Sequence, residues 1–348
     1  MKTNSIVLAD IASHNTNGKS VGHYFYLAHN YVEMFPECKI AGGPIYEQAF
    51  GEKQLIKLPY DTMHDESALM KKWHQWRNFR YLISECEDDV LVFQQAALAT
   101  LMVFLAITPS IRKKAFFITY DDDAVRSTFK RFVYRFAKRK LKGIICPNNK
   151  VASQYELPSC IVPDYIYVGG NDVQKSQQFE KIYDFCLVGR LAPEKGALGI
   201  IQKYRDSHYK VLIAGNPQDP ELKETLLKAA NGAENIELHL GYVEPDDYYR
   251  YIHSSKYTLL NYSGEYSIRS SGVVFDTLFA GVPVIGRRCA ALNFIEENEC
   301  GILYDDLATF NADEVLTDSK YEYFIRNIYK YRDTHRLYIS KLINFFHS

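Results

Sequence analysis

Residues 183–196 read YDFCLVGRLAPEKG and carry the strongest signal in the chain. Residues 183–188 have the apolar and aromatic composition of a buried parallel strand, which would end at Gly189. Arg190 and Lys195 follow in the adjoining loop, so two cations would lie just beyond the carboxyl end of a sheet. Open α/β sheets bind their ligands at that edge. The stretch therefore predicts an anion site in an α/β domain, although a solvated loop with two ordinary surface charges would have the same composition.

The remainder of the chain alternates strand-like and helix-like segments. Short β-branched or aromatic runs occur at residues 5–9, 89–93, 115–120, 209–215 and 282–286. Helix-length segments lie between several such runs, at residues 68–87, 127–142 and 221–230. This alternation predicts doubly wound parallel sheets.

The length of 348 residues fits two such domains. Pro, Gly and polar residues interrupt the pattern at 163–178, which is typical of a domain boundary. We predict a first domain over residues 1–165, a second over 166–320 and a helical segment over 321–348. The last segment is amphipathic, and its periodicity leaves open whether it packs on its own domain or crosses back to the first.

Composition excludes several classes of protein. With 47% hydrophobic residues, 24% charged residues and a net charge of -1, the chain is neither disordered nor fibrous and has no global field for nucleic acid. Its seven scattered cysteines are expected to be reduced core thiols. The first twenty residues or so lack the features of a signal peptide, which predicts a cytoplasmic protein. Residues 90–108 are apolar enough to suggest a membrane span, but Gln94 and Gln95 favour a buried strand followed by a buried helix.

A second constellation begins at Ser270, Ser271 and Gly272, just before a helical run. Backbone N–H groups and the dipole at such a helix start bind phosphate. Asp276 would lie one turn inside, where a carboxylate accepts hydrogen bonds from ribose hydroxyls in other nucleotide sites. The alternative is a plain helix start followed by an exposed carboxylate.

Taken together, these residues resemble the GT-B glycosyltransferases of family 4. The C-terminal domain of that family opens with G-R-L-x-x-x-K-G and later carries E-x7-E and G-x-P-V. The first and last elements are matched here by Gly189, Arg190, Leu191, Lys195, Gly196, Gly281, Pro283 and Val284. Asp276 stands at the second Glu of the middle element, but Ile268 stands at the first, which departs from the pattern.

The resemblance implies two Rossmann-like domains facing an interdomain cleft. It also implies transfer of a hexose from a nucleoside diphosphate sugar, with UDP favoured, to a glycan or lipid-linked acceptor. Retention of configuration, a role in surface polysaccharide biosynthesis and the absence of any further cofactor are expected with it. Arg190 and Lys195 would then stabilise the leaving diphosphate, and Asp276 would bind the ribose.

Other site residues are also implied by the resemblance. Glu265 is a candidate for the missing sugar-side carboxylate, while Arg269 or the Ser270 and Ser271 pair would contact the diphosphate. Tyr242 lies in a turn that resembles the place where family members hold the base.

The loop at 14–23 has the wrong spacing for a Walker P-loop and resembles the first loop of GT-B enzymes. We therefore place Gly18 and Lys19 near the donor phosphate, with an ordinary loop capped by Ser20 as the alternative. Asp121 follows a strand, and an inverting enzyme would need Asp121, Asp122 or His23 as its catalytic base, whereas a retaining one needs none. We expect no metal at the Asp triplet 121–123, because the two cations of the second half would do its electrostatic work.

Residues 129–142 hold seven cations interleaved with aromatics. Phe129, Phe132, Val133 and Phe136 would share one face of a helix. This pattern predicts contact with an anionic membrane surface, or else a core helix whose outer face is basic. The sequence leaves two rival functions open: a GT-B sugar-nucleotide epimerase, and a non-catalytic partner subunit of another transferase.

Overall fold

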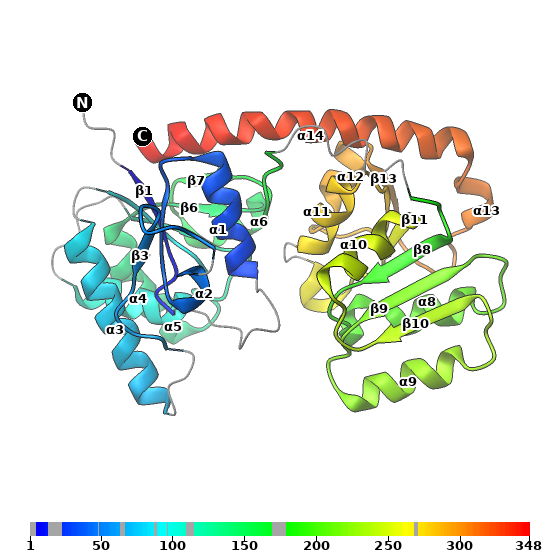
Figure 1. Cartoon of the computed structure of the whole chain (residues 1–348), viewed down its shortest axis with the longest axis horizontal. Helices are drawn as coiled ribbons and strands as arrows, with labels where there is room; N and C mark the ends of the chain where they lie inside the picture. The colour runs from blue at the N-terminus through cyan, green and yellow to red at the C-terminus, as the bar shows by residue number, and fades with distance from the viewer. Residues whose placement is uncertain are drawn as a thin grey trace. The chain divides into compact units, whose positions relative to one another are not determined.

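A computed structural model describes residues 5–12, 23–47, 49–62, 67–86, 89–95, 97–108, 115–168, 179–267 and 271–348. The chain forms two compact units, Met1–Val168 with Arg336–Ser348, and Gly169–His335 (Figure 1). Each unit is built on one parallel sheet with helices on both faces. The α/β class predicted from the sequence is confirmed.

The first unit contains a parallel sheet in the order β3-β2-β1-β4-β5-β6-β7. The strands are β1 (Ile6–Ala9), β2 (Lys39–Gly42), β3 (Leu55–Lys57), β4 (Val90–Phe93), β5 (Ala115–Ile118), β6 (Leu141–Cys146) and β7 (Ser159–Ile161). The helices are α1 (His23–Met34), α2 (Pro44–Glu47), α3 (Ala68–Glu85), α4 (Leu98–Ile107), α5 (Thr128–Ala137), the short η1 (Lys138–Lys140) and α6 (Asn149–Tyr155). The strand order reverses between β1 and β4.

Side chains alternate between the two faces of this sheet, and both faces are buried. In β4, Leu91 and Phe93 pack with α3, α4, α5 and α6, whereas Val90 and Val92 pack with α1 and α2. The end of α14 (Asp318–His347) adds Leu342 and Phe346 to the second of these layers.

The second unit has a parallel sheet in the order β10-β9-β8-β11-β12-β13. The strands are β8 (Tyr183–Val188), β9 (Val211–Gly215), β10 (Ile236–Leu240), β11 (Ser255–Leu260), β12 (Val284–Arg287) and β13 (Gly301–Tyr304). The helices are η2 (Pro193–Lys195), α8 (Ala197–Tyr204), α9 (Pro220–Ala230), α10 (Pro245–His253), η3 (Gly264–Ser267), α11 (Gly272–Phe279), α12 (Asn293–Glu297) and α13 (Ala312–Val315). The first part of α14 packs Phe324 and Ile328 into the core of this unit.

The structure confirms some of the elements predicted from the sequence and corrects the end of one helix. The stretch 90–108 divides into β4 and α4 as predicted, and none of the described helices is both long and apolar enough to span a bilayer. The helix predicted over 127–142 ends too late, because Leu141 is buried in β6 and pairs with Ala115 of β5. Strand pairing therefore overrides the helical pattern there. The seven cysteines are free, and all except Cys289 are buried.

Candidate functional site

The loop after β8 makes a close turn at the carboxyl edge of the second sheet. Gly189 has φ of +95°, a conformation that L side chains rarely adopt. A Cβ atom there would lie 3.2 Å from Cγ2 of Val273 and 3.7 Å from Nζ of Lys195. The amine of Lys195 and the first turn of α11 therefore converge on the backbone of Gly189.

Lys195 is a buried cation, and no anion lies beside it among the described residues. Its residue is only 4% exposed, and it has no hydrogen-bond or ion-pair partner within the described part of the chain. Its Nζ lies 5.3 Å from the ring centroid of Tyr266. Burial, and secondarily the charge of Arg190, lower the pKa of Lys195 to about 8. An ammonium in such a place is stabilised by a bound anion.

Two loops hold Lys195 in position. The backbone N–H and the hydroxyl of Ser263 donate hydrogen bonds to the carbonyl oxygen of Glu194, at 2.8 and 3.2 Å. This contact joins η2, which follows β8, to η3, which follows β11. Since β8 and β11 are neighbours at which the strand order reverses, the two loops flank the switch point where doubly wound sheets bind ligands.

The start of α11 forms the other wall of this site. The hydroxyls of Ser271 and Tyr262 lie 2.8 Å apart, and α11 begins at Gly272 as predicted. Asp276 lies one turn inside, and its Oδ2 accepts a 2.8 Å hydrogen bond from the hydroxyl of Tyr248. Burial, together with the Asp276 carboxylate, raises the pKa of Tyr248 well above its usual range, so this tyrosine stays a donor.

The structure brings some of the other predicted residues to the same edge of the sheet. Arg190 is exposed in the loop after β8, and Tyr242 is 55% exposed in the turn after β10. The backbone of Glu265 lies in η3, but its side chain is outside what is described. Outside the described residues altogether lie Gly18, Lys19, Arg269 and Ser270.

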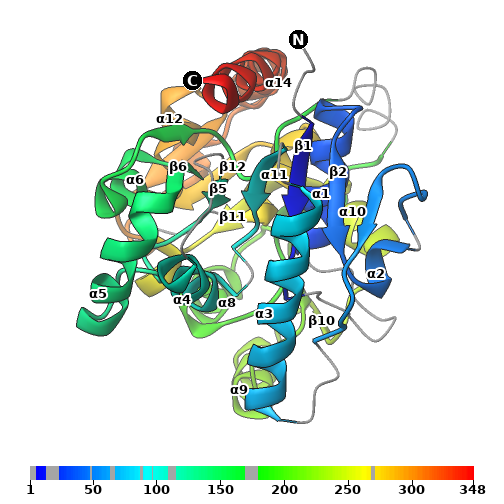
Figure 2. The same cartoon turned by 90° about the vertical axis from the view of Figure 1, so that its left-hand side faces the viewer.

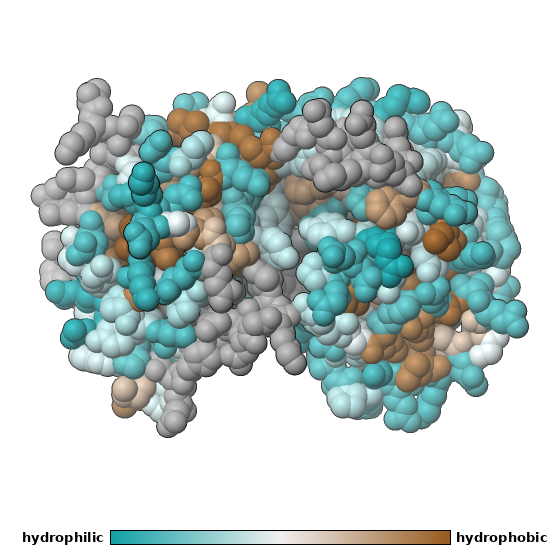
Figure 3. Space-filling model, viewed as in Figure 1, coloured by the Kyte–Doolittle hydropathy of each residue, from teal (hydrophilic) through white to brown (hydrophobic). Residues whose placement is uncertain are grey.

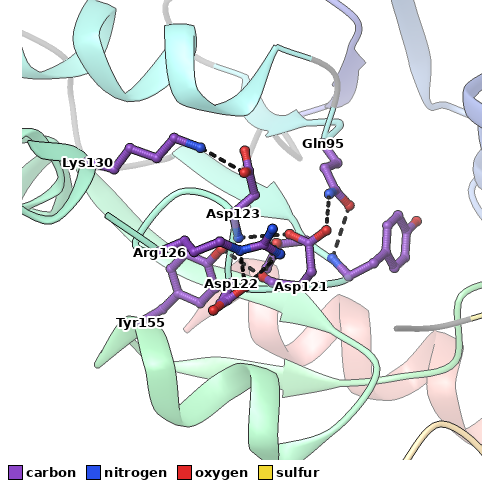
Figure 4. Close-up of polar contacts among 9 residues, drawn as sticks. Gln95, Asp121, Asp122, Asp123, Arg126, Lys130 and Tyr155 are labelled. Carbon is purple, nitrogen blue, oxygen red and sulfur yellow. Dashed lines mark hydrogen bonds and ion pairs between the residues drawn. The ribbon is translucent and has the colours of Figure 1, made fainter. Parts of the chain in front are cut away.

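The corresponding edge of the first sheet is polar but internally paired. Oδ1 of Asp121 accepts from the N–H of Asp123 at 2.9 Å, and Oδ2 accepts from Nε2 of Gln95 at 3.2 Å (Figure 4). Asp122 pairs with Arg126, and Asp123 pairs with Lys130. Among the described residues no group of acids, histidines or cysteines is arranged to hold a metal ion.

A second polar cluster lies at the switch point of the first sheet; the sequence indicated its Gln94, which follows a strand, but sequence reasoning missed its Asp10. Asp10 directly follows β1, is fully buried and accepts a 3.0 Å hydrogen bond from the hydroxyl of Tyr46. Gln94 directly follows β4 and lies beside Tyr46 at 1% exposure. The amide of Gln94 interacts with the Tyr46 hydroxyl, but neither of its polar atoms has a partner at full hydrogen-bond geometry in the described residues. The signal that could have identified Asp10 was its position directly after a buried strand.

Comparison with known proteins identifies solved structures that share this fold. No protein-family model and no curated protein sequence matches the chain. The N-terminal domain of Candida albicans trehalose-6-phosphate phosphatase matches with a TM-score of 0.68 at 10% identity, covering 99% of this chain and 97% of that one. AviGT4, a glycosyltransferase involved in avilamycin A biosynthesis, matches with a TM-score of 0.67 at 12% identity, over 99% and 97%.

HepE of Anabaena, solved in complex with UDP-glucose, matches with a TM-score of 0.65 at 13% identity, over 98% of this chain and 99% of that one. At these identities the likeness concerns the fold. The prediction from the sequence is confirmed in that respect: the chain has the GT-B fold of glycosyltransferases.

Proposed function

We propose that the chain is a family 4-like hexosyltransferase that uses a nucleoside diphosphate sugar as donor. The observation that carries the proposal is Lys195, which is buried, has no ion-pair partner among the described residues, and lies at the switch point of the second sheet against the first turn of α11. A diphosphate supplies the missing negative charge. The solved complex of HepE with UDP-glucose adds support through the shared fold, and UDP is the nucleotide we favour.

In the proposed reaction the bond between the anomeric carbon and the diphosphate oxygen breaks, and negative charge grows on the departing diphosphate. Lys195 and Arg190 lie where they would stabilise that charge more in the transition state than in the ground state. Backbone N–H groups at Ser271 and Gly272 would add to the same stabilisation. Retention needs no dedicated base if the departing phosphate takes the proton of the acceptor hydroxyl.

The remaining donor contacts are proposed from the resemblance to family 4 glycosyltransferases. Asp276, oriented by Tyr248, would accept hydrogen bonds from the ribose, and Tyr242 would lie against the base. Glu265 is proposed on the sugar side. The diphosphate would be contacted further by Arg269, Ser270, Gly18 and Lys19.

The acceptor is proposed to be a glycan or a lipid-linked sugar in surface polysaccharide biosynthesis, with the protein at the cytoplasmic face of the membrane. Gln94 is a candidate ligand for an acceptor hydroxyl, because its buried amide has no partner at full hydrogen-bond geometry among the described residues. Asp121 remains the candidate base if transfer inverts configuration. Its two carboxylate oxygens already accept hydrogen bonds, which favours the retaining course.

A calorimetric screen against UDP, GDP, ADP and CMP, followed by the corresponding sugars, tests the proposal. We expect micromolar binding of one diphosphate that Arg190→Ala weakens and that Arg250→Ala, an exposed arginine on α10, leaves unchanged. Acceptor-dependent release of the diphosphate would then establish transfer. Binding to no nucleotide would favour a partner subunit, and formation of a new sugar isomer without acceptor would favour an epimerase.

A further inference from the structure

One exposed face of α5 is aromatic, which folding of the first unit does not explain. Tyr134 and Ala137 of α5 are buried in the core, whereas Phe129, Phe132 and Phe136 are 71%, 58% and 44% exposed. At helical spacing these three rings lie on one face, roughly opposite to the buried pair. The sequence left open a core helix whose outer face is basic, and α5 does pack on the core with Arg131 and Arg135 exposed, but it also exposes this aromatic face. The aromatic face itself points outward.

This exposed surface continues over two neighbouring helices. α3, α4 and α5 lie on the same side of the seven-stranded sheet and are turned toward the viewer in Figure 2. Apolar residues are also visible in Figure 3 at the lower left, where α3 begins. We define the α3–α5 face by its exposed side chains, which are Leu69, Met70, Trp73, Val103, Ile107, Phe129, Phe132 and Phe136.

A groove of about 450 Å³ opens on the α3–α5 face. Its walls are mainly apolar, with Met102, Val103 and Phe104 from α4 and Phe129 and Val133 from α5. Two lysines, Lys72 and Lys130, line the same groove. Its size falls in the range of pockets that hold small amphiphilic molecules.

Lys130 and Lys138 are paired with Asp123 and Glu156, whereas two arginines beside the phenylalanines are not paired in the part of the chain that the structure describes. Arg131 and Arg135 are exposed on α5 and form no ion pair within the described residues. The guanidinium of Arg139 lies 5.9 Å from the ring centroid of Phe136. Apolar rings next to uncompensated cations are complementary to a surface that has negative charges above a hydrocarbon layer.

We propose that the α3–α5 face docks on an anionic phospholipid bilayer. Phe129, Phe132 and Phe136 enter the acyl boundary, while Arg131 and Arg135 contact lipid phosphates. The groove between α4 and α5 accepts part of one acyl chain. Charge complementarity favours this occupant, and three rings projecting in a row from a helix suit a surface that deforms around them. The inference stands whether or not the proposed transferase activity does.

Vesicle flotation tests the docking surface with the full chain. We expect the protein to float with vesicles of phosphatidylglycerol and phosphatidylcholine, to be released by high salt, and not to float with phosphatidylcholine alone. The triple variant Phe129→Ser, Phe132→Ser, Phe136→Ser is expected to lose at least ~10-fold in binding. Arg131→Gln with Arg135→Gln should lose several-fold. The matched control is Leu227→Ser with Lys223→Gln on α9, where Leu227 is 50% exposed, and it should bind like the wild type.

Tryptophan fluorescence gives a readout that a failure to fold does not imitate. The chain has 2 tryptophans, Trp73 and Trp76, and both lie on α3. Vesicles of brominated phosphatidylglycerol should therefore quench the tryptophan fluorescence of the wild type. They should quench the fluorescence of Trp73→Phe much less, because its remaining tryptophan, Trp76, packs on Phe79 and Phe104. Absence of quenching and flotation would overturn the proposal. So would equal binding by a folded triple variant, or a stable dimer in which a second copy covers this face.

Discussion

The carboxyl edges of the two sheets are built from similar strands but handle buried charge in opposite ways. At the edge of the first sheet, the buried carboxylate of Asp121 accepts hydrogen bonds from Gln95 and from the N–H of Asp123. At the edge of the second, the buried ammonium of Lys195 lies near the ring of Tyr266 but has no hydrogen-bond or ion-pair partner in the residues described. A satisfied charge stabilises its own loop, whereas an unsatisfied one is positioned for a ligand.

The largest effect is expected for Lys195→Met in the second unit. Loss of one charged group that stabilises the leaving diphosphate should lower kcat/KM by ~10²–10³-fold. Steady-state release of the diphosphate in the presence of acceptor measures it. Gln95→Ala in the first unit should leave donor binding unchanged, and an equal loss of donor affinity in both variants would abolish the contrast between the two edges.

Lys195→Met should also stabilise the ligand-free protein, by on the order of 2 kcal/mol at pH 7. The pKa of Lys195 is lowered to about 8 in the folded protein, so the unfolded chain binds this proton more tightly. The resulting loss in the free energy of unfolding is fully present below pH 8. It disappears as pH rises from 8 toward the pKa of an unfolded lysine. Chemical denaturation at pH 7 measures the change.

Lys181 is the matched control for that measurement. Burial lowers its pKa to about 8 as well, but its Nζ donates to the carbonyl oxygens of His253 and Ser255 at 2.8 and 3.0 Å. Lys181→Met leaves those carbonyls without a donor and should therefore destabilise the protein. If both variants destabilised it equally, Lys195 would be a structural lysine.

Asp121 distinguishes a positioning role from a catalytic one. Asp121→Ala removes the acceptor of two hydrogen bonds and should lower the free energy of unfolding by about 1–3 kcal/mol, measured by urea denaturation. Asp121→Asn keeps the size of the side chain and one oxygen. A retaining transferase would lose less than ~10-fold in kcat with it, whereas a loss above ~10²-fold would make Asp121 the base of an inverting enzyme.

The pH dependence of donor binding sharpens the account of Lys195. The ammonium must be protonated to hold a diphosphate, and its pKa in the free protein is about 8. The affinity for UDP should therefore fall about tenfold between pH 7 and pH 9, while Lys195→Met should show a flat profile over that window. Isothermal titration at both values makes the comparison.

The smallest effect is expected for Tyr248→Phe, which removes the donor to Oδ2 of Asp276. The carboxylate keeps its place on α11 but loses its orientation, so UDP binding should weaken by about 1 kcal/mol. Binding of 2′-deoxy-UDP should change less than that of UDP. A larger change with the deoxy nucleotide would contradict the proposal that Asp276 binds the ribose.

The sequence was informative where the signal is local. The strand at 183–188, the glycine at 189 and the helix start at 272 were all predicted from neighbouring residues, and each is observed. The burial of Lys195 was not, because it depends on the loop after β11, where Ser263 donates to the carbonyl oxygen of Glu194 from a distant part of the chain.

Two further points depended on contacts that periodicity does not carry. The pattern at 129–142 predicted which phenylalanines share a face of α5 but left open whether that face is exposed or packs on the core, because this depends on how α5 contacts the rest of the unit. The strand end before Asp121 was also apparent. Its pairing with Gln95 requires that β4 and β5 be neighbours in the sheet, which only the topology provides.

The most direct test compares the binding of UDP and uridine to the wild type and to Lys195→Met by isothermal titration. Because the two ligands differ only in the diphosphate, the account predicts that the wild type binds UDP far more tightly and that the variant loses most of that difference. The affinity for uridine should stay the same in both proteins. Equal UDP affinities for wild type and variant would contradict the claim that Lys195 holds a diphosphate.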